Sequence, residues 1–527
     1  MRRREFLRRL PLGFAVGVSL PTSALFADES TDAAIFNVRQ FGAKGNGQAK
    51  DTKAVQKAID AAGREGGCVH FPPGRYLCGT LHLRNRITIR LESGATLVAS
   101  PERSDFDDYE KLSYNSFSDA ETTDFNYGLL CGCEVVEITI LGPGRIDMAR
   151  NQRGGPKAIA LKLCKNVLIR DLIIENSPNY NISMLGCDFV DIFGVTIRNG
   201  YADGIDPDCC RSVRIADCCV ESWDDAIVLK SSPSLGYLRA TEQVAVTNCV
   251  LTTACNGLKL GTESSGGFRD IVFSNCAISS NPELWAGHRA ASGLSIEMVD
   301  GGAIERVAVS NLTMRDVRAP VFVRLGNRGR GQKEPKPEHL VGVSISDVIA
   351  TGADLASSIT GIPGFPVSGV TLRNFRVTTR GGGKAALASQ NVAEREKDYP
   401  DAKDFGDLPA YGLYCRHVQD LALDQIHLAY EHSEGRPAII LDEVADSDLR
   451  AIAAKPPTGT EPVIRFRGVR DCFVQGCRAL TGTGTWAVVS GDKTVHLRES
   501  GNDLTAAARD FELAPEVTAG SVNRGAK

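Results

Sequence analysis

The chain has 527 residues, of which 60 are lysine or arginine and 64 are aspartate or glutamate, so its formal net charge is −4. So small a net charge excludes the strong overall attraction that would favour a nucleic-acid partner. A chain of this length ordinarily forms roughly two to four domains, unless a repeat fold absorbs most of it.

The N-terminus has the pattern of an export signal. Arg3 and Arg4 lie in the sequence R-R-E-F-L-R, which matches the twin-arginine pattern, and a short apolar run from Pro11 to Ala27 follows. We expect residues 1–27 to be a cleavable twin-arginine signal peptide, with a retained membrane anchor as the alternative. No later segment has the roughly 18 consecutive apolar residues of a membrane span. We therefore expect a periplasmic or extracellular protein, monomeric and without stable insertion in a membrane.

All 16 cysteines follow the signal segment, and they recur with the strand pattern described below rather than in paired C-x-x-C motifs. That spacing argues against a zinc site. Twin-arginine substrates fold before export, in a reducing compartment, so we expect most of these cysteines to be buried core thiols. One or two disulfide bonds formed after export are the alternative.

The chain after the signal opens with a strand from Phe36, a glycine-rich turn and a helix. The turn at residues 41–47 lacks the G-K-[S/T] ending of a phosphate-binding loop, which argues against that function. Residues 51–62 carry an apolar stripe, which predicts a helix with Asp51 as its N-cap and an end at Gly63. Such a helix can cover the open end of a stack of strands, whose unpaired backbone groups would otherwise invite edge pairing.

Beyond this helix, short β-rich segments recur at a regular interval. Clear copies start near Val167, Val190, Val213 and Val244, and weaker copies continue to about residue 480. Each copy is a strand, a short corner and another strand, with alternating apolar residues that are buried only when copies stack. The pattern predicts an all-β solenoid over residues 34–485, with a C-terminal cap or tail over residues 486–527.

The corners and the interruptions of the repeat also carry information. Asparagines at matching corners are expected to stack in a ladder that satisfies backbone groups: Asn248, Asn275, Asn311 and Asn374. Irregular stretches are expected to form loops: residues 101–128, 281–292, 327–340, 352–366 and 380–412. Loops that leave one side of a rigid solenoid can wall a substrate groove.

The most informative stretch contains two acidic clusters about one repeat apart. Asp203, in A-D-G-I-D, precedes Asp224 and Asp225, in W-D-D-A-I, by 21 and 22 residues. If each repeat is one coil, the clusters lie on the same face of adjacent coils, about 4.8 Å apart along the axis. Carboxylates this close disfavour each other's ionisation. A protonated acid beside an ionised base is what hydrolysis of a glycosidic bond requires, although an acidic ladder that binds a cation or water is the alternative.

The order D-G-x-D followed one coil later by D-D-A-I resembles glycoside hydrolase family 28, the polygalacturonases and rhamnogalacturonases. The resemblance extends from about Phe36 to about Thr379. It implies a single-stranded right-handed parallel β-helix, the pectin-lyase-like solenoid. It further implies hydrolysis of pectin-type polysaccharide with inversion, and without a metal or another cofactor. In this resemblance Asp224 protonates the leaving oxygen, while Asp203 and Asp225 orient and deprotonate water.

The chain departs from this family at the residues that grip the substrate. Polygalacturonases have Gly-His-Gly and, later, Arg-x-Lys, whereas this chain has Asn256 in place of the histidine and Ser295 and Glu297 in place of the Arg-x-Lys pair. Asparagine cannot exchange a proton near neutral pH. Glu297 would repel a uronate carboxylate unless it is protonated or paired with Lys259.

We expect five residues to contact the substrate: Asn256, Lys259, Glu297, Arg324 and Lys230. Arg324 is favoured because a planar guanidinium bonds both oxygens of a carboxylate, with a surface salt bridge as the alternative. Lys230 is expected to contact Asp225 or a substrate carboxylate, or else to be a surface cation. A neutral sugar such as rhamnose at the cleavage point would remove the need for a cationic grip.

Two other functions remain as alternatives. A polysaccharide lyase on the same fold would use calcium or a basic residue to abstract a proton beside a uronate. A non-catalytic carbohydrate-binding β-helix would follow if catalysis had been lost together with the family's histidine and Arg-x-Lys pair.

Overall fold

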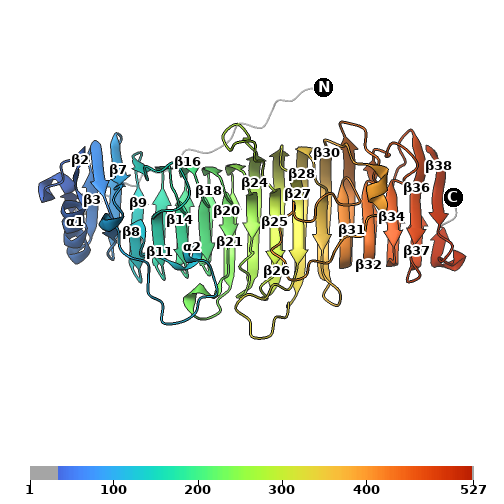
Figure 1. The fold of residues 1–527 in the computed structure, drawn as a ribbon, viewed down its shortest axis with the longest axis horizontal. Coiled ribbons are helices and arrows are strands. Elements are labelled where there is room, and N and C mark those ends of the chain that lie inside the picture. The colour runs from blue at the N-terminus through green and yellow to red at the C-terminus, as the bar shows by residue number, and fades with distance from the viewer. Residues whose placement is uncertain (1–33, 525–527) are drawn as a thin grey trace, which may run out of the picture. The chain divides into compact units, whose positions relative to one another are not determined.

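The structure of the chain is a computed structural model that describes residues 34–524. The expected signal peptide, residues 1–27, lies outside the described residues. Most of the regular structure is β-strand, and each strand pairs in parallel with strands of the neighbouring coils. Figure 1 shows these coils in succession between helix α1 (Thr52–Glu65), in blue, and strand β38 (Ala507–Leu513), in red.

The strands of successive coils align in three parallel ladders. The first ladder consists of β1 (Ile35–Asn37), β3 (Gly67–Phe71), β6 (Ile87–Leu91), β9 (Val136–Leu141), β12 (Lys165–Arg170), β15 (Asp188–Phe193), β18 (Arg211–Ala216), β21 (Thr241–Thr247), β24 (Phe268–Ser279), β26 (Ile304–Arg315), β28 (Leu340–Ala353), β30 (Val367–Thr379), β31 (Leu413–Tyr430), β32 (Ile439–Arg450), β35 (Arg470–Gln475), β37 (Val495–Ser500) and β39 (Val522–Arg524). The second ladder consists of β2 (Asn46–Lys50), β4 (Gly74–Cys78), β7 (Ala95–Ala99), β10 (Arg145–Asp147), β13 (Ile173–Glu175), β16 (Thr196–Gly200), β19 (Cys219–Ser222) and β22 (Val250–Thr253), and it continues in the later parts of β24 to β31 and in β33 (Ala453–Ala454).

The third ladder carries the candidate residues, and we call it the site sheet. It consists of β5 (Leu81–His82), β8 (Gly128–Cys133), β11 (Lys157–Lys162), β14 (Ile182–Leu185), β17 (Ile205–Asp208), β20 (Ile227–Leu229), β23 (Asn256–Leu260), β25 (Ser292–Met298), β27 (Ala319–Leu325), β29 (Ser357–Thr360), the first parts of β31 and β32, β34 (Ile464–Arg467), β36 (Thr483–Ser490) and β38. Because the ladders are parallel and in register, residues one coil apart in the sequence lie side by side.

The core is a continuous stack of apolar side chains inside the coils. Val190, Val213 and Val244 occupy one register position in successive coils, and each is at most 1% exposed. One buried cluster extends from Val38 to Val522. Burial of each such side chain contributes about 1.5–3 kcal/mol to folding. The predicted repeat is therefore confirmed, and the stack fixes where the outward residues between the buried ones emerge.

The N-terminal helix and its N-cap position, Asp51, were predicted correctly, but its C-terminal end was not. Helix α1 continues past Gly63 to Glu65 and ends at Gly66, whose φ is +78°. Gly63 is needed for a different reason: a Cβ there would lie 2.5 Å from the Cβ of Arg84. Asp51 makes no side-chain cap bond, because its carboxylate accepts from the backbone of residues 44 and 45 instead. The apolar stripe of α1 packs against β1, β3 and β5, so the helix covers the first coil as expected.

The corner asparagines adopt the left-handed conformation, with φ from 46° to 56°. Asn311 donates to Asn275 over 3.0 Å, as a stacked ladder requires. Asn275 in turn donates to the hydroxyl of Thr247, and Asn374 donates to Asp347. The ladder is therefore mixed, because hydroxyl and carboxylate groups satisfy the same corners as well as amides do.

The structure differs from two of our expectations about the later coils. Residues 352–366, expected to be a loop, contain strand β29 of the site sheet. The parallel pairing also continues beyond residue 485, where we expected a cap or tail, through β37, β38 and β39. These strands carry few branched apolar residues, so their period is weak, and the preceding coil supplies the register that the sequence does not display.

The cysteines match their expected role: all 16 are free thiols and most are buried in the coils. Cys187 illustrates their packing, since its sulfur accepts the backbone N–H of Cys164 one coil earlier. No helix within residues 34–524 has the length and hydropathy to span a membrane.

Candidate active site

The two acidic motifs meet at the start of two neighbouring strands of the site sheet. Asp203 comes just before β17, and Asp224 and Asp225 come just before β20, with Ile205 paired directly to Ile227. The backbone N–H of Gly204 donates to the carbonyl of Asp225 over 2.9 Å. A side chain at position 204 would lie 2.4 Å from the Ala226 carbonyl, so only glycine lets the coils approach this closely. The predicted juxtaposition is thus built into the fold.

Asp203 is buried in a network with one lysine. The Lys230 ammonium lies 2.8 Å from Asp203, 2.7 Å from Asp206 and 3.0 Å from the Tyr180 hydroxyl. Burial raises the pKa of Asp203 well above its usual value, Lys230 opposes that rise, and the charges of Asp224 and Asp225 add to it. Lys230 is therefore buried and holds Asp203, so it is not a surface cation, and its ammonium pairs with Asp203 and Asp206 rather than with Asp225.

Asp224 is the most exposed of the three acids, with 26% of its side chain accessible. Arg153 reaches it from the loop between β10 and β11, with Nη1 2.5 Å from Oδ2. The same guanidinium holds Glu121 of helix α2 (Ala120–Thr123) at 2.6 Å. Burial raises the pKa of Asp224, but the charge and hydrogen bond of Arg153, together with the charges of Lys259 and Lys230, outweigh it, so the pKa lies below its usual value. The surroundings of Asp203 and Asp224 therefore favour opposite protonation states.

Asp225 is held at both carboxylate oxygens, by hydrogen bonds to one and an ion pair with the other. The backbone and side-chain amides of Asn256 lie 3.2 and 2.7 Å from Oδ1, and the Lys259 ammonium lies 3.0 Å from Oδ2. Asn256 is itself fixed, because its carbonyl oxygen accepts from the Ser292 hydroxyl over 2.7 Å. These contacts orient the Asp225 carboxylate and stabilise its charge.

The substitutions for the family's Arg-x-Lys pair form an internal network. Lys259 lies 3.7 Å from Glu297, and the Ser295 hydroxyl donates to the other Glu297 oxygen. Burial raises the pKa of Glu297 to about 7, although Lys259 opposes the rise. Glu297 thus pairs with Lys259, which is one of the two conditions under which it would not repel a uronate. Because these side chains are nearly inaccessible, they do not replace an exposed cationic grip.

Arg324 belongs to the same sheet but makes a different set of contacts. Its guanidinium donates to the backbone carbonyls of Gly361, Glu394 and Arg395, and it is 2% exposed. Burial lowers the pKa of Arg324 to about 10. These bonds attach the loop around residue 395 to the site sheet. They also occupy N–H donors of the Arg324 guanidinium that binding of a substrate carboxylate would require.

Three residues beside the acids were not found from the sequence: Arg153, Glu121 and Tyr399. The Tyr399 ring is 51% exposed, and its hydroxyl accepts from Lys259 over 3.4 Å. All three lie in loops without a period, and only the folded chain brings them to Asp224 and Asp225. Neither the glycine pair that follows Arg153 nor the isolated Tyr399 is part of a sequence pattern that would mark a site residue.

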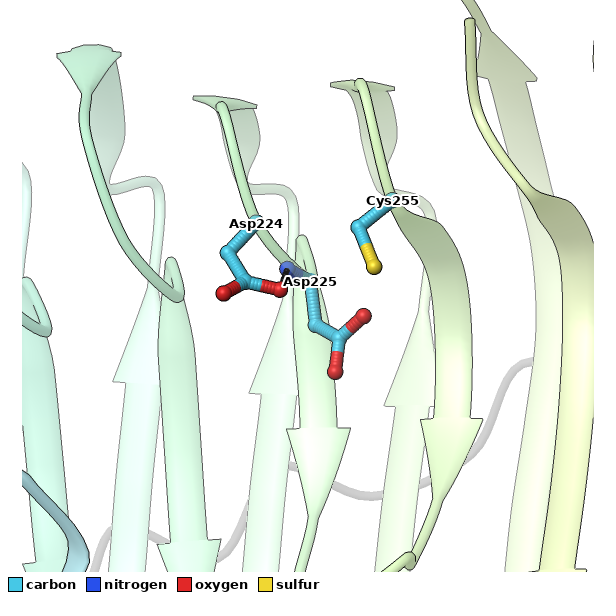
Figure 2. Close-up of side chains that lie close together, drawn as sticks. All are labelled: Asp224, Asp225 and Cys255. Carbon is cyan, nitrogen blue, oxygen red and sulfur yellow. Dashed lines mark hydrogen bonds between the residues drawn. The ribbon is translucent and has the colours of Figure 1, made fainter. Parts of the chain in front are cut away.

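Asp224, Asp225 and Cys255 form the group of candidate metal ligands within the described residues, with ligand atoms within 4.8 Å of one another. Figure 2 shows the two carboxylates and the thiol at the starts of adjacent coils. The carboxylates already face Arg153 and Lys259, at 2.5 and 3.0 Å. A metal ion would have to displace both cations, so the arrangement suits ion pairing better than metal binding.

Known proteins are similar to this chain in sequence and in fold. The model of the family described as "Glycosyl hydrolases family 28" matches residues 143–397, which include the three acids. The chain is 28% identical over 365 residues to a probable polygalacturonase of Vitis vinifera, covering 64% of this chain and 73% of that protein. It is 23% identical over 396 residues to an exo-poly-alpha-D-galacturonosidase of Dickeya chrysanthemi, covering 62% of this chain and 64% of that protein.

Among solved structures, the hyperthermoactive exopolygalacturonase of Thermotoga maritima superposes with a TM-score of 0.56 at 20% identity, over 66% of this chain and 87% of that one. The polygalacturonase of Erwinia carotovora superposes with a TM-score of 0.50 at 18% identity, over 63% of this chain and 90% of that one. These likenesses, together with the three ladders, confirm the expected right-handed parallel β-helix.

Proposed function

The chain belongs to glycosyl hydrolase family 28, and we propose that it cleaves glycosidic bonds of pectin-type polysaccharide by acid/base hydrolysis with inversion. One observation carries the proposal: Asp203 and the pair Asp224 and Asp225 stand before two directly paired strands, where the charges of Asp224 and Asp225 add to the rise in the pKa of Asp203. Separate proton-donating and proton-accepting carboxyls are what this reaction requires.

In the proposed mechanism Asp224 is the acid and Asp225 is the base. Asp224 is the carboxyl most accessible to a leaving oxygen, and its protonated form would donate to the glycosidic oxygen as the bond to C1 breaks. Asp225, held by Asn256 and Lys259, would take a proton from the attacking water. Asp203, fixed by Lys230, would help to hold that water. One carboxylate oxygen of Asp224 lies within 4.8 Å of one of Asp225, which is less than the about 6.5–9.5 Å usual between the acid and the base of an inverting site, so the configuration of the product is the deciding test.

Asn256 and Lys259 would contribute through Asp225 rather than by proton transfer. Lys230 would act in the same indirect way, by fixing Asp203. Glu297 would balance the Lys259 charge. Arg324 would place the loop near residue 395, and thereby Tyr399, beside the groove.

Two observations weigh against the lyase alternative. A lyase base must be able to accept a proton, but the pKa values of Lys230 and Lys259 are raised well above the usual lysine value, because their carboxylate partners outweigh burial. Asp224 and Asp225 also already face cations where a calcium ion would bind. A non-catalytic binding surface, in turn, would not need a buried carboxyl with a strongly perturbed pKa.

The location of the protein is also part of the proposal. The R-R-E-F-L-R sequence and the apolar run after it support export through a twin-arginine signal, to the periplasm or beyond the cell. Pectin-type polysaccharide is too large to enter a cell intact, so an exported monomer would meet its substrate outside the cytoplasm.

Reducing-sugar release from separate homogalacturonan and rhamnogalacturonan fractions tests the proposed activity. We expect release from at least one fraction, without the ultraviolet absorbance of an unsaturated lyase product. Absorbing products would support the lyase alternative, and binding without any product would support the non-catalytic alternative.

A further inference from the structure

One of the cations paired with the three acids has an accessible side chain. Within residues 34–524, ion pairs join the three acids to Lys230, Lys259 and Arg153. The two lysine side chains are 5% and 4% exposed, whereas that of Arg153 is 42% exposed. A ligand that approaches the acids therefore meets Arg153 before it meets either lysine.

Arg153 is already arranged to bind carboxylates. Its Nη1 lies 2.5 Å from Asp224, while Nη2 and Nε lie 2.6 and 3.2 Å from the two oxygens of Glu121. A planar guanidinium holding one carboxylate along its edge is the strong, orientation-specific form of this contact. Arg153 thus bridges one carboxylate of the catalytic motif and one of an inserted loop.

The surroundings of Arg153 permit it to change partners. It lies outside the ladders, in the loop between β10 and β11, where the next residue, Gly154, has φ +103° and open space around its Cα. Glu121 is 29% exposed, and it lies in the short helix α2 rather than in a coil. Exchange of one carboxylate for another would leave the buried stack undisturbed.

The pairing with Asp224 conflicts with the proposed role of Asp224 as an acid. While Arg153 is bound, its charge favours the ionised carboxylate, which has no proton to give. Without Arg153, the two interactions that lower the pKa of Asp224 most would be lost, so that pKa would rise. An event that removes Arg153 from Asp224 would therefore prepare the acid for reaction.

We propose that Arg153 binds the carboxylate of an acidic sugar next to the scissile bond, and that by this exchange it releases Asp224 to take up a proton. The inference rests on the proposed function and assigns Arg153 as its specificity-determining residue. Asp224 gains its proton from solvent and passes it to the leaving oxygen as the C1–O bond breaks. Water then forms the new C1–O bond and gives its proton to Asp225. After product leaves, the ionised Asp224 pairs with Arg153 again.

A neutral sugar offers only hydroxyl oxygens, which do not compete with a carboxylate for a guanidinium. Loss of one hydrogen bond to a charged group lowers affinity by roughly ten- to a hundredfold. We therefore expect a preference of that size for an acidic sugar, and it should depend on Arg153. This device supplies the selectivity for uronate that Ser295 and Glu297 do not.

The test measures binding, so that it does not depend on turnover. The probes are a sulfur-linked trigalacturonate, whose thioglycosidic bonds resist hydrolysis, and its carboxyl-reduced counterpart. Calorimetric titration compares the native full chain, Arg153→Gln and the control Arg214→Gln. Arg214 holds Asp191 through two contacts of 2.6 Å, like Arg153 with its partners, but it lies on strand β18 of the first ladder.

We expect the native chain and Arg214→Gln to bind the acidic probe at least tenfold more tightly than the reduced probe, and Arg153→Gln to lose that preference. An Arg153→Gln chain that keeps the preference, or a native chain without one, would overturn the inference. Failure of the proposed function is distinct: it would appear as selective binding through Arg153 without any sugar released from polysaccharide. Hydrolysis with unchanged selectivity in Arg153→Gln would contradict the inference alone.

Discussion

The side-chain amide of Asn256 donates to Asp225 over 2.7 Å. Asn256 thereby occupies the place where the resembled family has histidine, and it serves the neighbouring carboxylate without exchanging a proton itself. The site therefore depends on fixed hydrogen bonds and buried lysines around its acids.

Asn256→Asp should be more harmful than Asn256→Ala. The aspartate would place a second carboxylate against Asp225 and draw Lys259 away from it, whereas alanine only removes hydrogen bonds worth about 1.5–3 kcal/mol. We expect kcat to fall roughly tenfold to a hundredfold for alanine and further for aspartate. Steady-state kinetics would measure this, with Asn248→Ala at a corner outside the site as the control. Equal activity of Asn256→Asp and the native chain would contradict the role of Asn256.

Gly204→Ala should separate the two acidic motifs. The added Cβ would lie 2.4 Å from both the Ala226 carbonyl and a Val220 methyl, so the coils must move apart. Overpacking of this kind costs about 1–3 kcal/mol. We expect a lower melting temperature and a lower kcat. Gly484→Ala, on the exposed side of β36 with nothing within 4 Å, should change neither, and an effect as large there would show that the loss at Gly204 is not due to the close approach.

Glu297 should make stability fall as pH rises. Its pKa is about 7 in the folded chain and 4.5 in the reference state, so the folded chain binds this proton more tightly. Its contribution is therefore complete below pH 4.5 and is lost as pH rises toward about 7, by an amount on the order of 3 kcal/mol. The charged groups facing it are Lys259, Asp225 and Asp401.

Glu297→Gln, which stays neutral, should gain stability relative to the native chain between about pH 5 and pH 8 in urea denaturation. Glu305→Gln should show no such gain, because hydrogen bonds from His339 and Arg306 lower the pKa of Glu305. A constant stability difference for Glu297→Gln over this range would contradict the assignment.

The pH profile should distinguish free protein from bound protein. A general acid loses activity as pH rises through its pKa, and kcat/KM reports the free form whereas kcat reports the complex. Arg153 holds the pKa of Asp224 low in the free form, so the basic limb of kcat/KM should lie below that of kcat. The groups that face Asp224 are Arg153, Lys259, Lys230, Asp203, Asp225 and Cys255.

Arg153→Gln should move the basic limb of kcat/KM to higher pH, toward that of kcat, whereas Arg214→Gln should leave both limbs in place. A purely structural role for Arg153 would lower the rate at every pH without moving a limb. That outcome would contradict the partner exchange.

The sequence predicted the coils and the meeting of Asp203 with Asp224 and Asp225, because a regular period converts spacing into position. It also indicated that Glu297 would be either protonated or paired with Lys259. Arg153 and Tyr399 could not be predicted because their loops have no period. The partners of Lys230 were predicted wrongly, because spacing alone does not tell which of several carboxylates a long side chain reaches. The strands after residue 485 were not predicted because their own sequence has a weak period, and the preceding coil sets their register.

The most direct test of the central claim is hydrolysis by the native chain and by Asp224→Asn, followed by proton NMR of the first products. Asp224 is partly exposed and its main partner is the accessible Arg153, so the variant should fold with an unchanged melting temperature. We predict newly formed reducing ends of inverted configuration from the native chain, and a rate at least about a hundredfold lower for Asp224→Asn. A variant that keeps most of the activity, or products of retained configuration, would contradict the account.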